Sequence, residues 1–156
     1  MDLNNEVNRG LICKYCGSPT ELVDSSEIYN GVSYGRIYLC RKCQAYVSCH
    51  KGTDTAMGSV ANAELRKLRH TAHEWFDSIW KHKLKKSRYN ANSWLSLRLK
   101  MNKNFTHMGL LDEEDCKRVI EISSEYIREH RPQLWEEINT KLTESKHDNT
   151  ENSRTT

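Results

Sequence analysis

Two C-x-x-C pairs constrain the fold of this chain more than any other feature. Cys13 and Cys16 form the first pair, Cys40 and Cys43 form the second, and 23 residues lie between them. Each pair can close a tight turn that points both sulfurs at one ion, so two turns complete a tetrahedron with Zn–S bonds of about 2.3 Å. Gly17, directly after the first pair, supplies the permissive backbone that such a turn favours. The spacing therefore predicts one structural zinc ion bound by these four cysteines.

Two alternatives to zinc remain open from the cysteines alone, namely reduced thiols without metal and two disulfides. Disulfides are typical of secreted proteins, whereas the first residues here are acidic and polar and do not resemble an export signal. No apolar run approaches the roughly 18–20 residues of a membrane-spanning helix. We therefore expect a cytoplasmic protein. A site closed by four sulfurs has no open position, so the ion is expected to be structural and not catalytic.

The pattern of apolar residues changes along the chain. Short strand-like segments at 20–23, 27–29 and 35–39 surround Asn30-Gly31, a strong hairpin signal. From Gly58 onward the apolar residues recur at helical spacing. We predict an α+β fold, with a small N-terminal β zinc ribbon of two hairpins over residues 1–57. A helical domain of about four helices, with a basic first half, follows over 58–143, and residues 144–156 are expected to be a disordered tail.

Several helix boundaries can be predicted. Ser59 or Asn62 is expected to cap the first helix, and Asp112 is expected to cap another whose first turn is acidic. Pro132 suits the first turn of the last helix. A helix is also expected from about residue 87 to 100. The residues expected to point inward from it are Tyr89, Trp94, Leu95 and Leu99.

The cysteine segments and the helical residues after them carry a resemblance to a known family. The segments are 13–17, 38–47, 49–54, 58–66, 72–73, 76–77, 80–81 and 107–116. Over about two-thirds of the chain they resemble the zinc-finger-containing domain family of unknown function found in bacterial and phage genomes. The resemblance implies bacterial or phage origin and a zinc ribbon followed by helices, with the four C-x-x-C cysteines as zinc ligands. It implies little about activity.

The net charge of +3 conceals a strong asymmetry along the chain. Residues 1–60 have a net charge of 0, residues 61–110 of +8 and residues 111–156 of −5. A solvated charged face is one explanation of the basic stretch, and contact with phosphates is the other, because Lys and Arg release counterions when they neutralise phosphates. The candidate nucleic-acid contacts are Arg66, Arg69, Lys81, Lys83, Lys85, Lys86 and Arg88.

The function that we predict is a structural-zinc module, a weakly sequence-selective accessory protein that binds DNA or RNA. No base-reading helix and no RNA-binding signature can be recognised in the sequence. One alternative is a protein–protein interaction adaptor that modulates a host machine. A third hypothesis is a hydrolase that uses Cys49, His50 and His107, with Asp54 as a further group, although no diagnostic catalytic spacing is present. No small-molecule substrate is evident.

Overall fold

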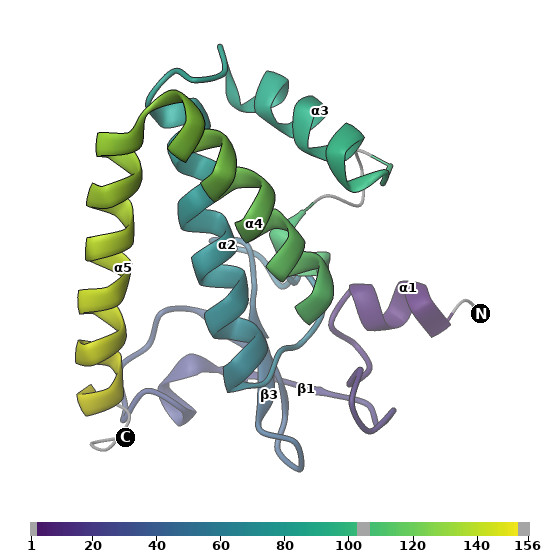
Figure 1. The fold of residues 1–156 in the computed structure, drawn as a ribbon. Coiled ribbons are helices and arrows are strands. Elements are labelled where there is room, and N and C mark those ends of the chain that lie inside the picture. The colour runs from purple at the N-terminus through teal and green to yellow at the C-terminus, as the bar shows by residue number, and fades with distance from the viewer. Residues whose placement is uncertain (1–2, 103–106, 153–156) are drawn as a thin grey trace. The chain divides into compact units, whose positions relative to one another are not determined.

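The computed structural model describes residues 3–102 and 107–152 (Figure 1). The chain divides into two compact units after Lys67. The sequence had placed this boundary ten residues earlier, after residue 57. No described helix combines the length and the apolar composition that crossing a bilayer requires.

Unit 1, residues 1–67, is built on a small antiparallel sheet with the strand order β1-β2-β3. Its elements are α1 (Leu3–Asn8), β1 (Glu21–Asp24), the 3-10 turn η1 (Ser25–Glu27), β2 (Arg36–Cys40) and β3 (Ala45–Ser48). The register pairs Glu21 with Leu39 and Cys40 with Ala45, so in the second C-x-x-C pair Cys40 ends β2 and Cys43 lies in the tight connection to β3. The α+β prediction is confirmed.

The core of unit 1 contains two of the cysteines themselves. Cys13 and Cys40 are buried together with Ala45, Val47 and Val60. Strands of four or five residues bury few apolar groups, and a sheet of this size has little stability of its own. The sulfur atoms thus occupy the place that larger apolar side chains fill in an ordinary domain.

The link between β1 and β2 differs from the predicted hairpin. Asn30 and Gly31 do form a turn with positive φ angles of 54° and 86°, but residues 27–29 are not a strand. Asp24 caps η1 by accepting a hydrogen bond from the Ser26 N–H, and the Ser25 N–H donates to the Gly35 carbonyl. Aspartate side chains bind nearby backbone N–H groups in this way and favour turns, so the chain leaves the sheet at Asp24.

Unit 2, residues 68–156, contains the longer helices. Its elements are α2 (Ala63–Lys81), which begins in unit 1, α3 (Arg88–Leu99), the short η3 (Met108–Leu110), α4 (Glu113–His130) and α5 (Pro132–Asn152). Helices α3 and α5 each pack against α4. The buried residues include Ala72, Phe76, Ile79, Leu95, Leu111, Cys116, Val119, Ile127 and Leu134.

Most predicted helix boundaries are confirmed. Asn62 accepts a hydrogen bond from the Leu65 N–H at the start of α2, and Asp112 accepts one from the Asp115 N–H at the start of α4. Pro132 is the first residue of α5. This helix continues to Asn152, beyond residue 143, where the sequence placed the start of a disordered tail. Residues 103–106, and residues 153–156 at the end of the expected tail, lie outside the described residues.

The prediction that Tyr89 points inward was wrong. Its side chain is 70% exposed, whereas Leu95 and Leu99 are buried as expected. The buried stripe of α3 runs through Ala91, Leu95 and Leu99 at intervals of four residues. Tyr89 lies two residues before this stripe, which is about 200° around the helix axis, so it faces the opposite side.

Gly10 provides a test of how tightly unit 1 is packed. Its φ is +76°, and an added Cβ would lie 3.0 Å from the Ala56 Cβ and 3.1 Å from the Val47 Cγ1. Gly10→Ala should destabilise the zinc-loaded protein by about 2–5 kcal/mol, through backbone strain and overpacking together. The control is Gly31→Ala, with a φ of +86° but no neighbour within 4 Å, which should cost only about 1–2 kcal/mol. Equal losses in chemical denaturation would contradict close packing at Gly10.

A histidine–aspartate pair on α2 gives a prediction about pH. The His73 Nδ1 lies 2.6 Å from the Asp77 Oδ2, and this hydrogen bond raises the pKa of His73. The folded state therefore holds the proton more tightly than the unfolded state. The stabilisation is complete below the ordinary histidine pKa of about 6.5 and is lost as pH rises through the raised value. Because the imidazole is about half exposed, the effect should be at most about 1 kcal/mol.

The variant His73→Gln should therefore lose stability relative to wild type at pH 5.5, and the difference should shrink towards pH 8.5, as measured by thermal unfolding at about these two pH values. His70→Gln is the matched control, because no ion pair involving His70 is found among the described residues of the same helix. An equal pH response of both variants would show that Asp77 does not hold the His73 proton.

Candidate metal centre

The two C-x-x-C pairs form turns of the same kind. In the first, the Gly17 N–H donates to the Cys13 carbonyl over 2.9 Å, and Gly17 has a φ of 75°. In the second, Gln44 takes the matching position with a φ of 52°. The non-glycine residue thus adopts the left-handed conformation at a cost of about 1–2 kcal/mol. Both turns have the backbone shape that directs two sulfurs to one side.

The four sulfur atoms meet at one point. The Sγ atoms of Cys13, Cys16, Cys40 and Cys43 all lie within 4.8 Å of one another, and those of Cys16 and Cys40 are 3.7 Å apart. A tetrahedron with Zn–S bonds of about 2.3 Å has sulfur–sulfur edges of about 3.8 Å. A disulfide would need a separation of about 2.05 Å, so all four thiols are free. Among the described residues these four form the only cluster suited to a metal ion.

The local electrostatics match a site that needs a cation. Burial raises the pKa of Cys13, and burial with hydrogen bonds to the other three cysteines raises the pKa of Cys43 to about 12. Hydrogen bonds from Ser18 lower the pKa of Cys16 to about 6. Four thiolates this close together would repel one another, but a dication deprotonates coordinating thiols outright. The Tyr15 N–H also lies 3.4 Å from the Cys13 sulfur, a donor that supports the ligand from outside the coordination shell.

The donor set therefore fits zinc. Soft thiolates in a tetrahedron are typical of Zn²⁺ or an iron–sulfur centre, and two C-x-x-C turns are typical of structural zinc. When bound, the ion supplies charge neutralisation and a cross-link, and four protein ligands leave it no place for a substrate. The chemistry of this site is structural.

A family comparison agrees with this geometry. A family model described as a zinc-finger-containing domain matches residues 9–126, about three-quarters of the chain. The chain belongs to this family. The matched residues include all four cysteines, so the predicted zinc-binding domain and its single zinc ion are supported by both sequence and structure. No curated protein and no solved structure shows significant similarity to the chain.

The predicted nucleic-acid contacts fall into two groups. Arg66 and Arg69 have partners within the protein, since the Arg66 guanidinium lies 3.8 Å from the centroid of the Tyr46 ring and the Arg69 Nε donates to the Leu111 carbonyl. The other five lie at the end of α2, in the connection to α3 and at the start of α3. They are Lys81, Lys83, Lys85, Lys86 and Arg88, of which Lys85 is partly buried and the other four are exposed.

The residues of the hydrolase hypothesis are not brought together within one unit. Cys49, His50 and Asp54 belong to unit 1, whereas His107 belongs to unit 2. Burial, followed by the charge of Asp54, raises the pKa of Cys49, so its thiol is protonated at neutral pH. A nucleophilic cysteine needs a lowered pKa, because the thiolate is the reactive form. No hydrogen bond between the Cys49 thiol and the His50 ring is found among the described residues, and the structure gives this hypothesis no support.

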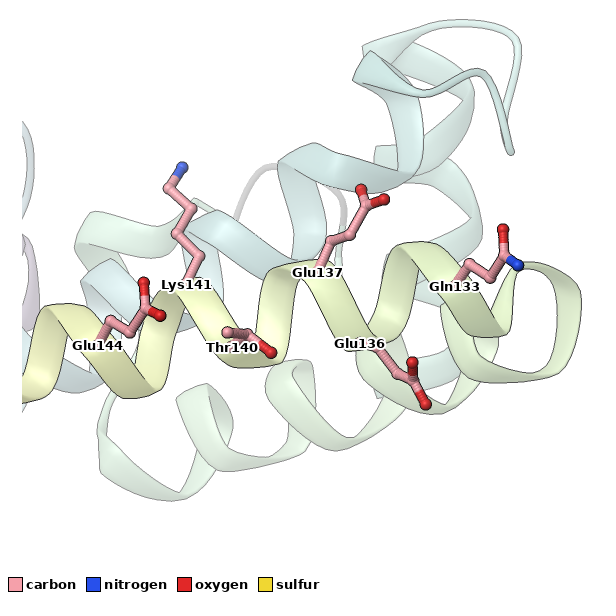
Figure 2. Close-up of a pocket in the computed structure, with 6 residues that line it drawn as sticks. All are labelled: Gln133, Glu136, Glu137, Thr140, Lys141 and Glu144. Atoms are coloured by element: carbon pink, nitrogen blue, oxygen red, sulfur yellow. The ribbon is translucent and has the colours of Figure 1, made fainter.

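Hollows lined by described residues also lie outside the metal centre. One, of about 560 Å³, lies along α5 and is lined by Gln133, Glu136, Glu137, Thr140, Lys141 and Glu144. Figure 2 shows that these side chains spread along a single helix and do not converge on one point. Another, of about 840 Å³, lies in unit 1 around the loop that contains Cys49 and Asp54. Sequence reasoning had identified residues of this loop but had not predicted a hollow.

The metal site is tested by replacing one ligand. Cys16→Ser removes one of four thiolates and should abolish stoichiometric zinc and the structure of unit 1, because binding of structural zinc contributes about 10–16 kcal/mol to folding. Metal analysis of the purified protein and the visible absorption of its cobalt-substituted form measure the loss. Cys49→Ser, which changes a thiol outside the cluster, should retain one ion. Wild-type protein that keeps its fold without metal in a strong chelator would contradict the assignment.

Proposed function

We propose that this protein is a zinc-stabilised accessory module that binds nucleic acid with little sequence selectivity, through the cationic segment formed by residues 81–100. This segment holds seven Lys or Arg residues and no Asp or Glu. That composition is the observation that carries the proposal, because a run of uncompensated cations attracts a polyanion.

The charges of the cationic segment are not neutralised inside the protein. Among the described residues, Lys81 is the only member with a carboxylate within 4.0 Å, that of Asp77. Several basic residues elsewhere are paired with carboxylates, and Arg41, for example, bonds both Glu21 and Glu27 at 2.7 and 2.6 Å. The segment therefore keeps a positive potential.

The start of α3 strengthens this potential. The N-terminus of a helix carries a partial positive charge, which acidic residues usually offset. Helix α4 follows this rule with three acidic residues in its first turn, whereas α3 has none and begins at Arg88. The exposed Lys83 and Lys86 precede it. Cations at the positive end of a helix are locally unfavourable, and an anion at this place would relieve the repulsion.

Aromatic rings orient several of these cations. The Lys85 ammonium lies 5.4 Å from the ring centroid of Trp94 and 5.0 Å from that of Tyr126, and the Arg98 guanidinium lies 5.6 Å from Trp94. Contact with an aromatic face holds a cation in place without cancelling its charge. The ordered cations remain available to phosphates.

Contacts with phosphates fix where a nucleic acid lies on a protein, but they carry no sequence information. Lysines on a connection between helices suit this role better than the reading of base edges in a groove. The expected behaviour is thus strong dependence on salt and weak dependence on sequence.

Neutralisation of two exposed lysines tests the proposal. The double variant Lys83→Gln/Lys86→Gln should lower the slope of log affinity against log salt by about 0.7–0.9 for each phosphate that the variant no longer neutralises. Fluorescence anisotropy with labelled oligonucleotides over a range of salt concentrations measures the slope. The matched control is Lys117→Gln/Lys141→Gln, which changes the net charge equally but affects lysines paired with Glu114 and Glu74. The absence of binding at low salt, or equal slopes in both variants, would exclude the cationic segment as the interface.

The protein-interaction alternative is favoured by one different observation, the exposed acidic face of α5 that contains Glu136, Glu137 and Glu144. Such a face could contact a basic protein surface. Retention of one protein partner after nuclease treatment in a crosslinking pull-down would favour this adaptor role, whereas partners that disappear with nuclease would favour the nucleic-acid role.

A further inference from the structure

Unit 1 carries an exposed aromatic ring that is held by its surroundings. Tyr34 is 76% exposed, and its ring meets that of Tyr29 edge-on with centroids 5.2 Å apart. The Tyr29 hydroxyl lies 3.2 Å from that of Tyr46, so Tyr29 is itself anchored. The backbone is fixed as well, because the Tyr34 N–H donates to the Oγ of the buried Ser25 over 2.7 Å. Tyr34 is therefore positioned although most of its surface faces solvent.

Tyr34 is also part of the wall of the larger hollow. This hollow of about 840 Å³ lies between the start of β2, the end of β3 and the loop at residues 49–57. Its volume falls within the range of about 300–1,000 Å³ that small-molecule sites occupy. Met57, 49% exposed, supplies a second apolar group to its lining.

The charge of the hollow favours an anion. Arg36 and Lys51 line it against a single carboxylate, that of Asp54. The Arg36 Nη1 lies 3.2 Å from the Asp54 Oδ2, which uses one of the five N–H donors of the guanidinium. Lys51 has no ion-pair partner within 4.0 Å among the residues that the structure describes. Donors for a phosphate thus remain beside the aromatic ring.

The loop that forms the hollow is tied to the sheet. The Tyr38 hydroxyl donates to the Asp54 carbonyl over 2.6 Å, and Cys49 forms an antiparallel bridge with Ala56. The Met57 N–H donates to the Ser48 carbonyl over 2.9 Å. These bonds preform the hollow, so a ligand does not need to order it at the cost of binding free energy.

We infer that Tyr34 and this hollow bind one unpaired nucleotide of a single-stranded nucleic acid, with the base stacked on the Tyr34 ring and its phosphate bound by Arg36 and Lys51. The inference rests on the proposed function and specifies its substrate class. Every base has a face that can stack on an aromatic ring, so such a site accepts any sequence. The bases of a duplex are stacked on each other and do not offer these faces, so the site selects single strands.

Binding of full-length, zinc-loaded protein to a single-stranded oligonucleotide containing a fluorescent purine analogue, and to the blunt duplex of the same sequence, tests this inference. Tyr34→Ala should weaken single-strand binding by roughly 5- to 100-fold, as expected for the loss of one stacked base, and should leave duplex binding within about 2-fold. Tyr34→Phe should retain both affinities. Val32→Ala, which removes another exposed apolar side chain of unit 1 that does not line the hollow, is the control and should change neither.

The phosphate interaction is tested separately with Lys51→Gln, which should lower the salt slope for the single strand by about 0.7. Unchanged zinc content and circular dichroism show that each variant is folded. If Tyr34→Ala leaves single-strand affinity unchanged, or lowers single-strand and duplex affinity equally, the stacking site is overturned while salt-dependent binding still supports the proposed function. If wild-type protein binds neither oligonucleotide at low salt, the proposed function fails and this site with it.

Discussion

The structure of unit 1 depends on four sulfur atoms that one ion can draw together. The sheet has three strands of four or five residues, and the buried groups of the unit include Cys13 and Cys40. Without an ion these thiols are weakly polar groups in contact, and their mutual repulsion on ionisation would oppose closure. With zinc bound, the same sulfurs become a cross-link between a turn near residue 13 and a turn near residue 40. The metal centre thus replaces the apolar core that a segment of this length cannot build.

Sequence reasoning succeeded where structure is determined over a few residues. The zinc ligands follow from two local turns, and the caps at Asn62 and Asp112 follow from side chains that bind N–H groups three residues later. It failed where two local signals competed. Near residue 30 the Asn-Gly turn formed as predicted, but the capping by Asp24 ended β1 first and changed the hairpin into a longer connection.

The basic residues show a second limit of prediction from the sequence. Arg66 and Arg69 contribute to the basic stretch as much as the lysines after them, and no sequence rule separates them. The structure places the Arg66 guanidinium on the Tyr46 ring and bonds the Arg69 Nε to the Leu111 carbonyl. Both contacts join residues far apart along the chain, so they depend on tertiary structure. Composition therefore predicts that a region is basic, whereas the contacts decide which of its charges are free to meet a ligand.

The two proposed contacts differ in what they can distinguish. Cations along residues 81–100 respond to the density of phosphates, which single strands and duplexes both provide, and their affinity falls with salt in either case. An exposed ring at Tyr34 responds to the availability of a base face, which only unpaired nucleotides provide. Neither contact reads the identity of a base. A protein that combines them would recognise the structure of a nucleic acid and not its sequence, so its selectivity for single strands should depend on Tyr34 and its salt dependence mainly on the lysines of the cationic segment.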